Sequence, residues 1–311
     1  MRHESILDLI GNTPLVGIHA LSPNPDVKIY AKLEGQNPGG SSKDRIARKM
    51  VELGERDGVL QPGATILEPS SGNTGIGLAL VAKLRGYKLR VVMPDNVSIE
   101  RRQLLEIFGA EVTSSPGAEG SNGAIRRAQE IAAADPEYVF LYQYGNPANP
   151  LAHYEGTGPE IWADCPEVDV FVAGLGTSGT LMGVGRYLRE RNPEVQIVAV
   201  EPPAGELVQG LRSLDDGFVP PIFDAEVLDR KTIVRNRESI EWTRRLLDEC
   251  GVFAGISSGA AVAGAAKVAA RMESGTIVTL LPDGGWKYLS SGAWTDDLDV
   301  VEERAGRINY W

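Results

Sequence analysis

A lysine stands at a predicted helix start in the stretch NPGGSSKDR, residues 37–45. A helix start carries about half a positive charge and exposes unpaired N–H groups, so it disfavours an ammonium group. Burial or a positive dipole lowers a lysine pKa, and a lysine that can lose its proton is a nucleophile able to form a Schiff base. Lys43 is therefore a candidate for covalent chemistry. The alternative is a solvated lysine on the first turn, with Ser41 or Ser42 as an ordinary N-cap.

Two further loops carry hydroxyl and amide groups between a predicted strand and a predicted helix. In EPSSGNTG, residues 68–75, serine, asparagine and threonine side chains and backbone N–H groups meet at a helix start, which suits a carboxylate. In AGISSGAA, residues 254–261, Ser257 and Ser258 precede a helix of small residues. For both loops the alternative is an ordinary helix cap, which needs only one such side chain.

A third loop, GLGTSGT at residues 174–180, satisfies the GxGxxG pattern after a predicted strand. Glu201 closes the next strand about 20 residues later, as a dinucleotide-binding fold requires. The same loop also suits a single phosphate monoester, which its backbone N–H groups and hydroxyls could bind without a cationic side chain. The loop alone leaves both interpretations open.

Predicted strands alternate with predicted helices along nearly the whole chain, beginning with a strand at 27–34 and a helix at 43–58. This order implies βαβ units with right-handed crossovers and largely parallel sheets, whose active sites lie at the carboxyl ends of the strands. The proline-rich stretch at 143–151 breaks the rhythm and marks a boundary. We expect a smaller domain at 38–145 and a larger one built from 1–37 and 146–311.

Composition excludes several classes of function. The 311 residues are enough for two domains, and the net charge of −11 argues against nucleic acid or an anionic membrane as a partner. The N-terminus is too polar for a signal peptide and no apolar run is long enough to span a bilayer, so a cytoplasmic location is expected. Cys165 and Cys250 form no CxxC pair, and the three histidines lack metal-ligand spacing, so neither disulfides nor a metal site are expected.

Taken together, these loops resemble those of pyridoxal-phosphate enzymes of the tryptophan-synthase β type, fold type II, and specifically the cysteine synthases. The resemblance runs from IGNTPLV (10–16) to GGWKYLSSGA (284–293), and the motifs fall in the family's order. It implies an α/β fold with two three-layer α/β/α domains around mostly parallel twisted sheets. It also implies a transferase that makes L-cysteine by β-replacement through an α-aminoacrylate, and a homodimer.

The resemblance also assigns roles to residues. Lys43 would hold the pyridoxal phosphate and then act as base, Asn73 would hydrogen-bond the 3′ oxygen of the ring, and Ser257 would face the ring nitrogen. The cofactor phosphate would be bound by Gly176, Thr177, Ser178, Gly179 and Thr180. The substrate carboxylate would be bound by Ser70, Ser71 and Thr74.

The leaving group is the finer question. GLRSLDDGFVP, residues 210–220, resembles a segment of the cysteine synthases that accept O-phosphoserine, in which an arginine at the position of Arg212 meets the phosphate. A guanidinium group can donate two parallel hydrogen bonds to a phosphate dianion. Some B-type O-acetylserine enzymes also carry an arginine near here, and a solvated loop arginine is a further alternative. We therefore predict O-phosphoserine as the substrate, with O-acetylserine as the alternative.

Other questions stay open at this level. The sulfur donor could be sulfide, thiosulfate or the thiocarboxylate of a sulfur-carrier protein. The terminal Tyr310 and Trp311 could pack on a partner subunit or close the mouth of the active site. The rival enzyme class is a nicotinamide-dependent oxidoreductase built on residues 174–180, and the rival outside catalysis is a cofactor-binding relative that serves as an interaction partner.

Overall fold

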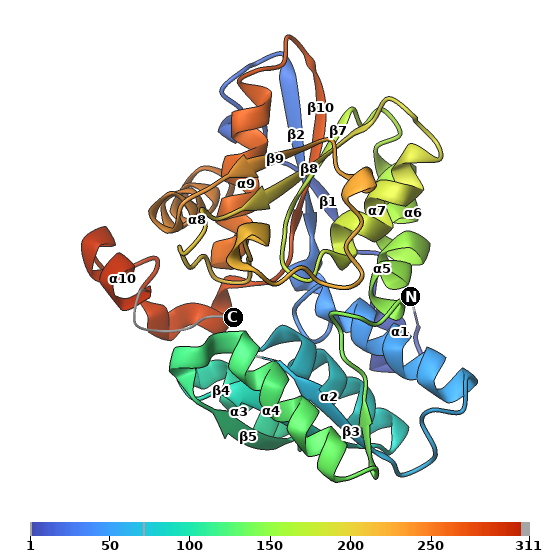
Figure 1. Ribbon diagram of the computed structural model, residues 1–311. Helices are drawn as coiled ribbons and strands as arrows, with labels where there is room; N and C mark the ends of the chain where they lie inside the picture. The colour runs from blue at the N-terminus through green and yellow to red at the C-terminus, as the bar shows by residue number, and fades with distance from the viewer. Residues whose placement is uncertain (1, 71, 306–311) are drawn as a thin grey trace.

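The computed structural model describes residues 2–70 and 72–305 and contains two sheets (Figure 1). The larger sheet has the strand order β1-β2-β10-β7-β8-β9, in which β1 runs antiparallel to β2 and the other neighbours are parallel. Its strands are β1 (Leu15–Gly17), β2 (Val27–Leu33), β7 (Val170–Gly174), β8 (Gln196–Glu201), β9 (Arg230–Ile233) and β10 (Gly275–Leu281). The predicted mostly parallel α/β architecture is confirmed.

The smaller sheet has the order β5-β4-β3-β6 with parallel neighbours. Its strands are β3 (Thr65–Pro69), β4 (Lys88–Pro94), β5 (Glu111–Ser115) and β6 (Tyr138–Phe140). All four lie inside the predicted smaller domain. The domain boundaries themselves, at 38 and 145, stay a prediction.

Helices cover both faces of each sheet (Figure 1). The α-helices are α1 (Lys43–Arg56), α2 (Asn73–Arg85), α3 (Ile99–Phe108), α4 (Gly120–Ala134), α5 (Ala148–Ala152), α6 (Gly158–Asp164), α7 (Gly179–Arg189), α8 (Asn236–Cys250), α9 (Ile256–Ala269) and α10 (Leu298–Ala305). Shorter 3-10 turns include η3 (Glu34–Gln36) and η8 (Gly285–Ser291), and a π-helical turn, η5, spans His153–Thr157. No helix among the described residues has the length and apolar character needed to cross a membrane.

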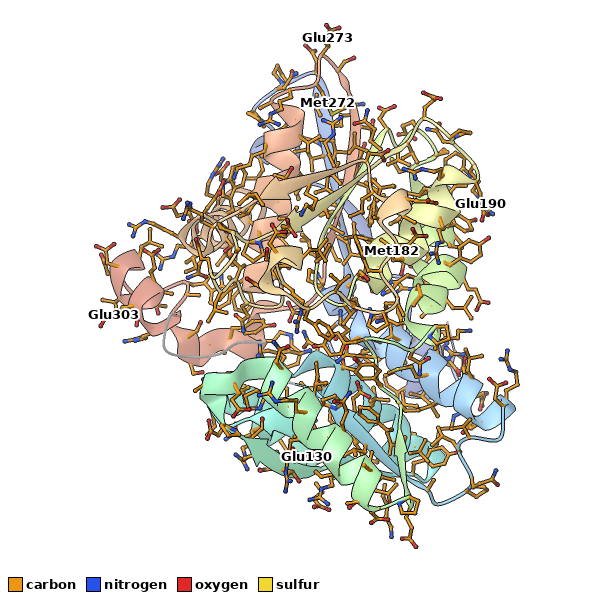
Figure 2. The ribbon with its side chains drawn as sticks, viewed as in Figure 1. Glu130, Met182, Glu190, Met272, Glu273 and Glu303 are labelled. Atoms are coloured by element: carbon orange, nitrogen blue, oxygen red, sulfur yellow. The ribbon has the colours of Figure 1, made fainter. Side chains whose placement is uncertain are left out.

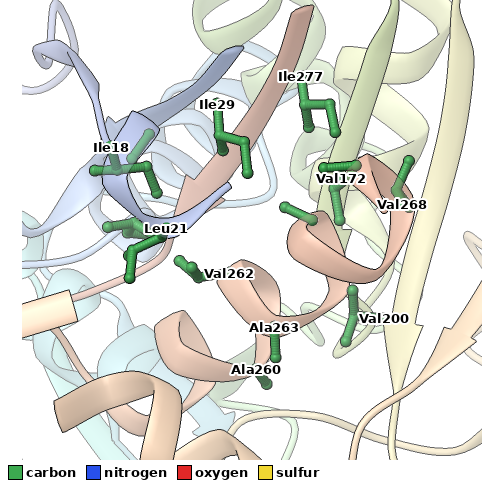
Figure 3. Close-up of a cluster of buried hydrophobic side chains, with 14 of the residues drawn as sticks. Ile18, Leu21, Ile29, Val172, Val200, Ala260, Val262, Ala263, Val268 and Ile277 are labelled. Atoms are coloured by element: carbon green, nitrogen blue, oxygen red, sulfur yellow. The ribbon is translucent and has the colours of Figure 1, made fainter. Parts of the chain in front are cut away.

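Successive side chains along a strand point to opposite faces of the larger sheet, so each strand contacts the helices on both faces. In β7, Val170 and Val172 pack in a cluster with α9, whereas Phe171 and Ala173 pack on the other face with α7. Figure 3 shows the first cluster, where Val172 and Val200 of the sheet lie near small residues of α9. Because both faces are buried, the central strands read as nearly continuous apolar runs.

Helix α9 is made of small residues because its backbone approaches its neighbours closely. Every residue of α9 except Lys267 is buried. A β-carbon at Gly259 would collide with the Ser239 carbonyl oxygen and the Thr243 hydroxyl of α8, and one at Gly264 would collide with Val200. The close approach of α8 to α9 therefore depends on glycine at residue 259.

We expect Gly259→Ala to lower the free energy of unfolding by about 1–3 kcal/mol or more, because the obstructing atom is a backbone carbonyl that can move only with its helix. Denaturant titration measures the change. The control is Lys267→Ala on the same helix, which removes a surface ion pair with Glu238 and should cost about 1 kcal/mol or less. Equal losses in the two variants would contradict this account of the α8–α9 contact.

Candidate active site

Lys43 is the first residue of α1 and lines a cavity of about 720 Å³. Its backbone N–H donates to Ser41 Oγ at 3.2 Å, and Ser42 stands at the N-cap without a side-chain cap. Loss of solvent lowers the pKa of the Lys43 amine, and the charges of Asp283 and Glu34 oppose that shift. The side chain is partly buried and faces the cavity, so the freely solvated alternative is wrong.

The cavity gathers residues that follow the carboxyl ends of β3, β7 and β10, where an open parallel sheet places its ligands. A second, adjoining cavity of about 410 Å³ shares Lys43, Gly176, Thr177, Gly210, Ser257 and Pro282 with the first. The predicted site residues that line one or both cavities are Lys43, Ser70, Asn73, Thr74, Gly176, Thr177, Ser178, Gly179, Thr180, Arg212 and Ser257. Ser71, Tyr310 and Trp311 lie outside the described residues.

Side-chain hydroxyl groups hold the loop after β3 in place through hydrogen bonds. Ser70 Oγ accepts from the backbone N–H groups of Gly72 at 3.2 Å and Gly75 at 3.0 Å. Thr74 Oγ1 donates to Gln143 Oε1 at 2.7 Å, so its proton is committed to the protein. The N-cap of α2 is Gly72, which has no side chain, and Ser70, two residues earlier, accepts the N–H of Gly75 in the first turn instead. Backbone N–H groups at the start of α2 remain the natural donors to an anion.

The loop after β7 has the features of a phosphate cradle. Ser178 is the N-cap of α7 in a left-handed conformation (φ 71°), and its buried Oγ has no hydrogen-bond partner among the described residues. A β-carbon at Gly176 would lie 2.9 Å from the Gly210 carbonyl oxygen. Left-handed backbone at a non-glycine residue and an orphaned buried hydroxyl both point to a ligand at this helix start. The residues present therefore fit a phosphate group.

A buried histidine supports the same loop from behind. His153, in the π-helical turn, lies 3.2 Å from Thr180 Oγ1 through Nε2 and 2.9 Å from Thr157 Oγ1 through Nδ1. Burial, and secondarily the charge of Lys43, holds the His153 pKa well below its usual value, so the ring is neutral near pH 7. Sequence reasoning gave His153 no role.

Ser257 lies inside α9 rather than before it, which corrects the prediction for this loop. The helix begins at Ile256 with Gly255 as N-cap, so neither Ser257 nor Ser258 is the cap. Gly210, at φ +80°, packs beside Ser257. A β-carbon added at Gly210 would lie 3.4 Å from Ser257 Oγ. The Ser257 side chain lines both cavities.

Arg212 is buried, with 7% of its surface exposed, so its interpretation as a solvated loop residue is wrong. Its guanidinium lies 4.5 Å from the centre of the Phe218 ring and 5.5 Å from that of Tyr144, and Nη1 donates to Asn122 Oδ1 at 3.3 Å. Arg101 of α3, which sequence reasoning missed, also lines the cavity, 4.7 Å from the centre of the Tyr288 ring.

The charged side chains that line the larger cavity are Lys43, Arg101 and Arg212, and none of the described lining residues is acidic. The protein as a whole is acidic, with a net charge of −11. Glu130, Glu190 and Glu303 are exposed and lie on the periphery of the molecule (Figure 2). The cavity is therefore the local basic site that an anionic substrate would need.

Asn73, the first residue of α2, contacts two charged side chains. Its Nδ2 donates to Asp283 Oδ2 at 2.7 Å, and its Oδ1 accepts from Lys287 Nζ at 2.7 Å. The hydroxyl of Tyr288 also donates to Asp283 Oδ2. Sequence reasoning quoted GGWKYLSSGA without giving its lysine or tyrosine a role, because the partners lie more than 200 residues apart.

Glu201, which the dinucleotide interpretation placed on a ribose, is occupied by the protein. It pairs with Lys231 Nζ at 2.6 Å and accepts from the Leu214 backbone N–H at 3.2 Å. This carboxylate is 1% exposed and does not line either cavity.

A fully buried glutamate supports the segment that carries Gln143 and Tyr144. Glu68 accepts from the backbone N–H groups of Tyr142 at 2.8 Å and Gln143 at 3.0 Å. Loss of solvent raises the Glu68 pKa to about 8, although the two hydrogen bonds oppose the shift. Through these bonds Glu68 fixes the segment that carries Gln143 and Tyr144 to the cavity.

We expect the stability of the protein to fall between pH 4.5 and about 8 on account of Glu68, because the unfolded chain releases this proton while the folded chain retains it. Glu68→Gln should flatten that decline, so the variant gains on the parent by a few kcal/mol from pH 5 to pH 8. Denaturant titrations across this range measure the difference, with the exposed Glu130→Gln as control. A parallel profile for parent and Glu68→Gln would refute the assignment.

Comparison with known proteins gives a consistent result. A family model described as pyridoxal-phosphate dependent enzyme matches residues 6–283. The cysteine synthase of Staphylococcus aureus strain Mu50 is 43% identical over 304 residues, which cover 94% of this chain and 98% of that protein.

Two solved structures are also similar. An O-ureido-L-serine synthase is 41% identical with a TM-score of 0.89, covering 96% of this chain and 97% of that one. A cysteine synthase from Entamoeba histolytica is 34% identical with a TM-score of 0.89, covering 98% and 96%. These matches rule out the nicotinamide interpretation of residues 174–180. The chain belongs to the pyridoxal-phosphate-dependent enzymes and, within them, to the cysteine synthase family.

Proposed function

We propose that this cysteine synthase uses O-phosphoserine as its amino-acid substrate. The observation that carries the proposal is the lining of the larger cavity, where Arg101 and Arg212 supply two guanidinium groups beside Lys43 and no described lining residue is a carboxylate. O-phosphoserine brings a carboxylate and a dianionic phosphate to the site, whereas O-acetylserine brings only the carboxylate.

The residues that would hold pyridoxal phosphate lie on the four elements already described. Lys43 would hold it through its amine, the backbone and hydroxyls of residues 176–180 would bind its phosphate, and Asn73 and Ser257 would contact its ring. When bound, the cofactor supplies an electron sink for the bond that breaks at the substrate Cα. Ser257 would present a neutral hydroxyl to the ring nitrogen, a weaker partner than a carboxylate, which favours elimination over transamination.

Lys43 is suited to accept the Cα proton at Nζ. Loss of solvent lowers its pKa, so a larger share of the amine is neutral near pH 7 than for an exposed lysine. The substrate carboxylate would bind at the start of α2, to backbone N–H groups near Ser70 and Thr74. The hydroxyl proton of Thr74 is directed to Gln143, so the backbone N–H of Thr74 is its better donor to the carboxylate.

Arg212 would bind the departing phosphate. Its guanidinium is held beside the rings of Phe218 and Tyr144, so little further conformational entropy is lost when it meets an anion. Charge-assisted hydrogen bonds of this kind are about twice as strong as neutral ones, and an acetyl ester offers no charge to pair. The homodimer, the cytoplasmic location and a sulfur-carrier partner stay predictions.

We expect Lys43→Ala to fold normally and to lose covalent attachment of the cofactor. Borohydride reduction followed by peptide mass analysis should find the parent modified at Lys43 and the variant unmodified. Lys49→Ala, on the exposed side of the same helix, is the control and should stay modified at Lys43. Modification of a different lysine in the parent would show that another residue holds the cofactor.

Arg212→Ala tests the leaving group. Loss of charge-assisted hydrogen bonds should lower kcat/KM for O-phosphoserine about 10- to 150-fold, while that for O-acetylserine should change by no more than about threefold. High salt should weaken O-phosphoserine use in the parent more than in the variant, because part of the attraction is Coulombic. Arg186→Ala, an exposed arginine paired with Asp224, is the control and should leave both values unchanged.

The two substrates separate the possible roles of Arg212. Equal losses for both esters would give Arg212 a purely structural role and would favour O-acetylserine. Parent turnover of O-acetylserine far above that of O-phosphoserine would also overturn the proposal.

A further inference from the structure

The amide of Asn73 is held between two buried charges of opposite sign. Lys287 is 0% exposed and Asp283 is 2% exposed, and each lies 2.7 Å from one end of the amide. Lys287 belongs to η8 and Asp283 lies two residues before the start of η8, so both charges come from one segment of the chain. Neither residue is among those expected to contact the substrate or the cofactor.

These two partners permit only one orientation of the amide. An ammonium group can only donate hydrogen bonds and an ionised carboxylate can only accept them. The Asn73 carbonyl must therefore face Lys287, and its NH₂ group must face Asp283. A flipped amide would direct N–H groups at the ammonium and its carbonyl at the carboxylate, which breaks two charge-assisted hydrogen bonds and creates two repulsions.

The surrounding structure fixes both charges in place. Lys287 Nζ also donates to the Gly40 carbonyl at 3.2 Å, and Asp283 accepts from the Tyr288 hydroxyl. Backbone pairing between Ser41 and Asp283 ties the segment to the loop before α1. Gly255 leaves the space that Asp283 fills, because a β-carbon there would collide with its Oδ1. The orientation of Asn73 is thus set by parts of the chain that cannot move independently of the cavity.

Other charged groups near this pair do not change the result. Asp44, Lys43 and Arg101 are the remaining charged groups that act on Lys287, and Asp44, in the first turn of α1, does not line either cavity. Asp44 accepts from the Gly39 backbone N–H at 2.5 Å. No hydrogen bond joins it to the Asn73 amide among the described residues.

We propose that Lys287 and Asp283 are positioning residues that make Asn73 a hydrogen-bond donor, never an acceptor, toward the bound cofactor. Asn73 lines the cavity, and the second hydrogen on its Nδ2 has no acceptor among the described residues. That N–H can donate a hydrogen bond to the ring oxygen, and the bond is stronger when the oxygen is ionised than when it is protonated. The inference rests on the proposed contact between Asn73 and the cofactor ring.

The test is a double-mutant cycle with cofactor alone, in the absence of amino-acid substrates. Lys287→Met should weaken pyridoxal phosphate binding to the apoprotein roughly tenfold, the scale of one hydrogen bond to a charged group. It should also move holoenzyme absorbance from the visible toward the near-ultraviolet, because the ionised ring oxygen loses its donor. Lys287→Arg keeps a cationic donor and should restore the parent spectrum.

The cycle with Asn73→Ala separates positioning from simple structural support. In the Asn73→Ala background, Lys287→Met should have little further effect on binding or spectrum, because the group it positions is already absent. The control is Lys32→Met, which removes another fully buried lysine, paired with Glu160 at 2.9 Å. It should lower thermal stability but leave the spectrum of the bound cofactor unchanged.

The outcomes distinguish this proposal from the proposed function. Full additivity of the two substitutions, or a Lys287→Met spectrum equal to the parent's while Asn73→Ala shifts, would overturn the positioning role. No effect from Asn73→Ala itself would remove the contact on which the inference rests. Because no amino-acid substrate is present, none of these results depends on whether the enzyme prefers O-phosphoserine or O-acetylserine.

Discussion

The constraint on which the site depends is the placement of a partly buried lysine amine at the start of α1, facing the cavity. Four helices begin at the same cavity, since Lys43, Asn73 and Gly179 are the first residues of α1, α2 and α7, and Ser257 lies in the first turn of α9. Their N-termini direct partial positive charge inward. That field disfavours the protonated amine and favours bound phosphate and carboxylate, so one arrangement both activates the base and holds anions.

Carboxylates in the cavity lining would cancel this field. The acidic side chains nearby instead form ion pairs or hydrogen bonds within the protein. Glu34 is paired with Arg45, Glu201 with Lys231, and Asp283 with Asn73 and Tyr288. Buried charges persist only when paired or hydrogen-bonded, so these contacts serve stability and keep the cavity basic at once. The excess acidic side chains of the protein lie outside the cavity lining. The cavity can therefore be basic although the net charge of the chain is −11.

The parts of the site that follow parallel strands could be predicted, because a strand, a glycine-rich turn and a helix start are contiguous in sequence. Ser70 and Gly176 are found in this way. Residues that act through distant contacts could not be found: Lys287 and Arg101 stand on ordinary helical patterns, and their relation to Asn73 and Tyr288 exists only after folding. The start of α9 was misjudged because its cap is a glycine, Gly255, and its small residues give no periodic signal.

The hydrogen-bonding groups of the cavity divide into those that can adapt and those that cannot. A hydroxyl such as that of Ser178 can rotate to donate or accept, so it adds binding energy with little discrimination. The arginines and the clamped amide of Asn73 can only donate, and the Gln143 carbonyl is already engaged by Thr74. The fixed side-chain groups that remain for a ligand are therefore mainly donors. Under the proposed function, a neutral ester would leave these donors without a charge to pair, so discrimination between the two esters would follow charge more than shape.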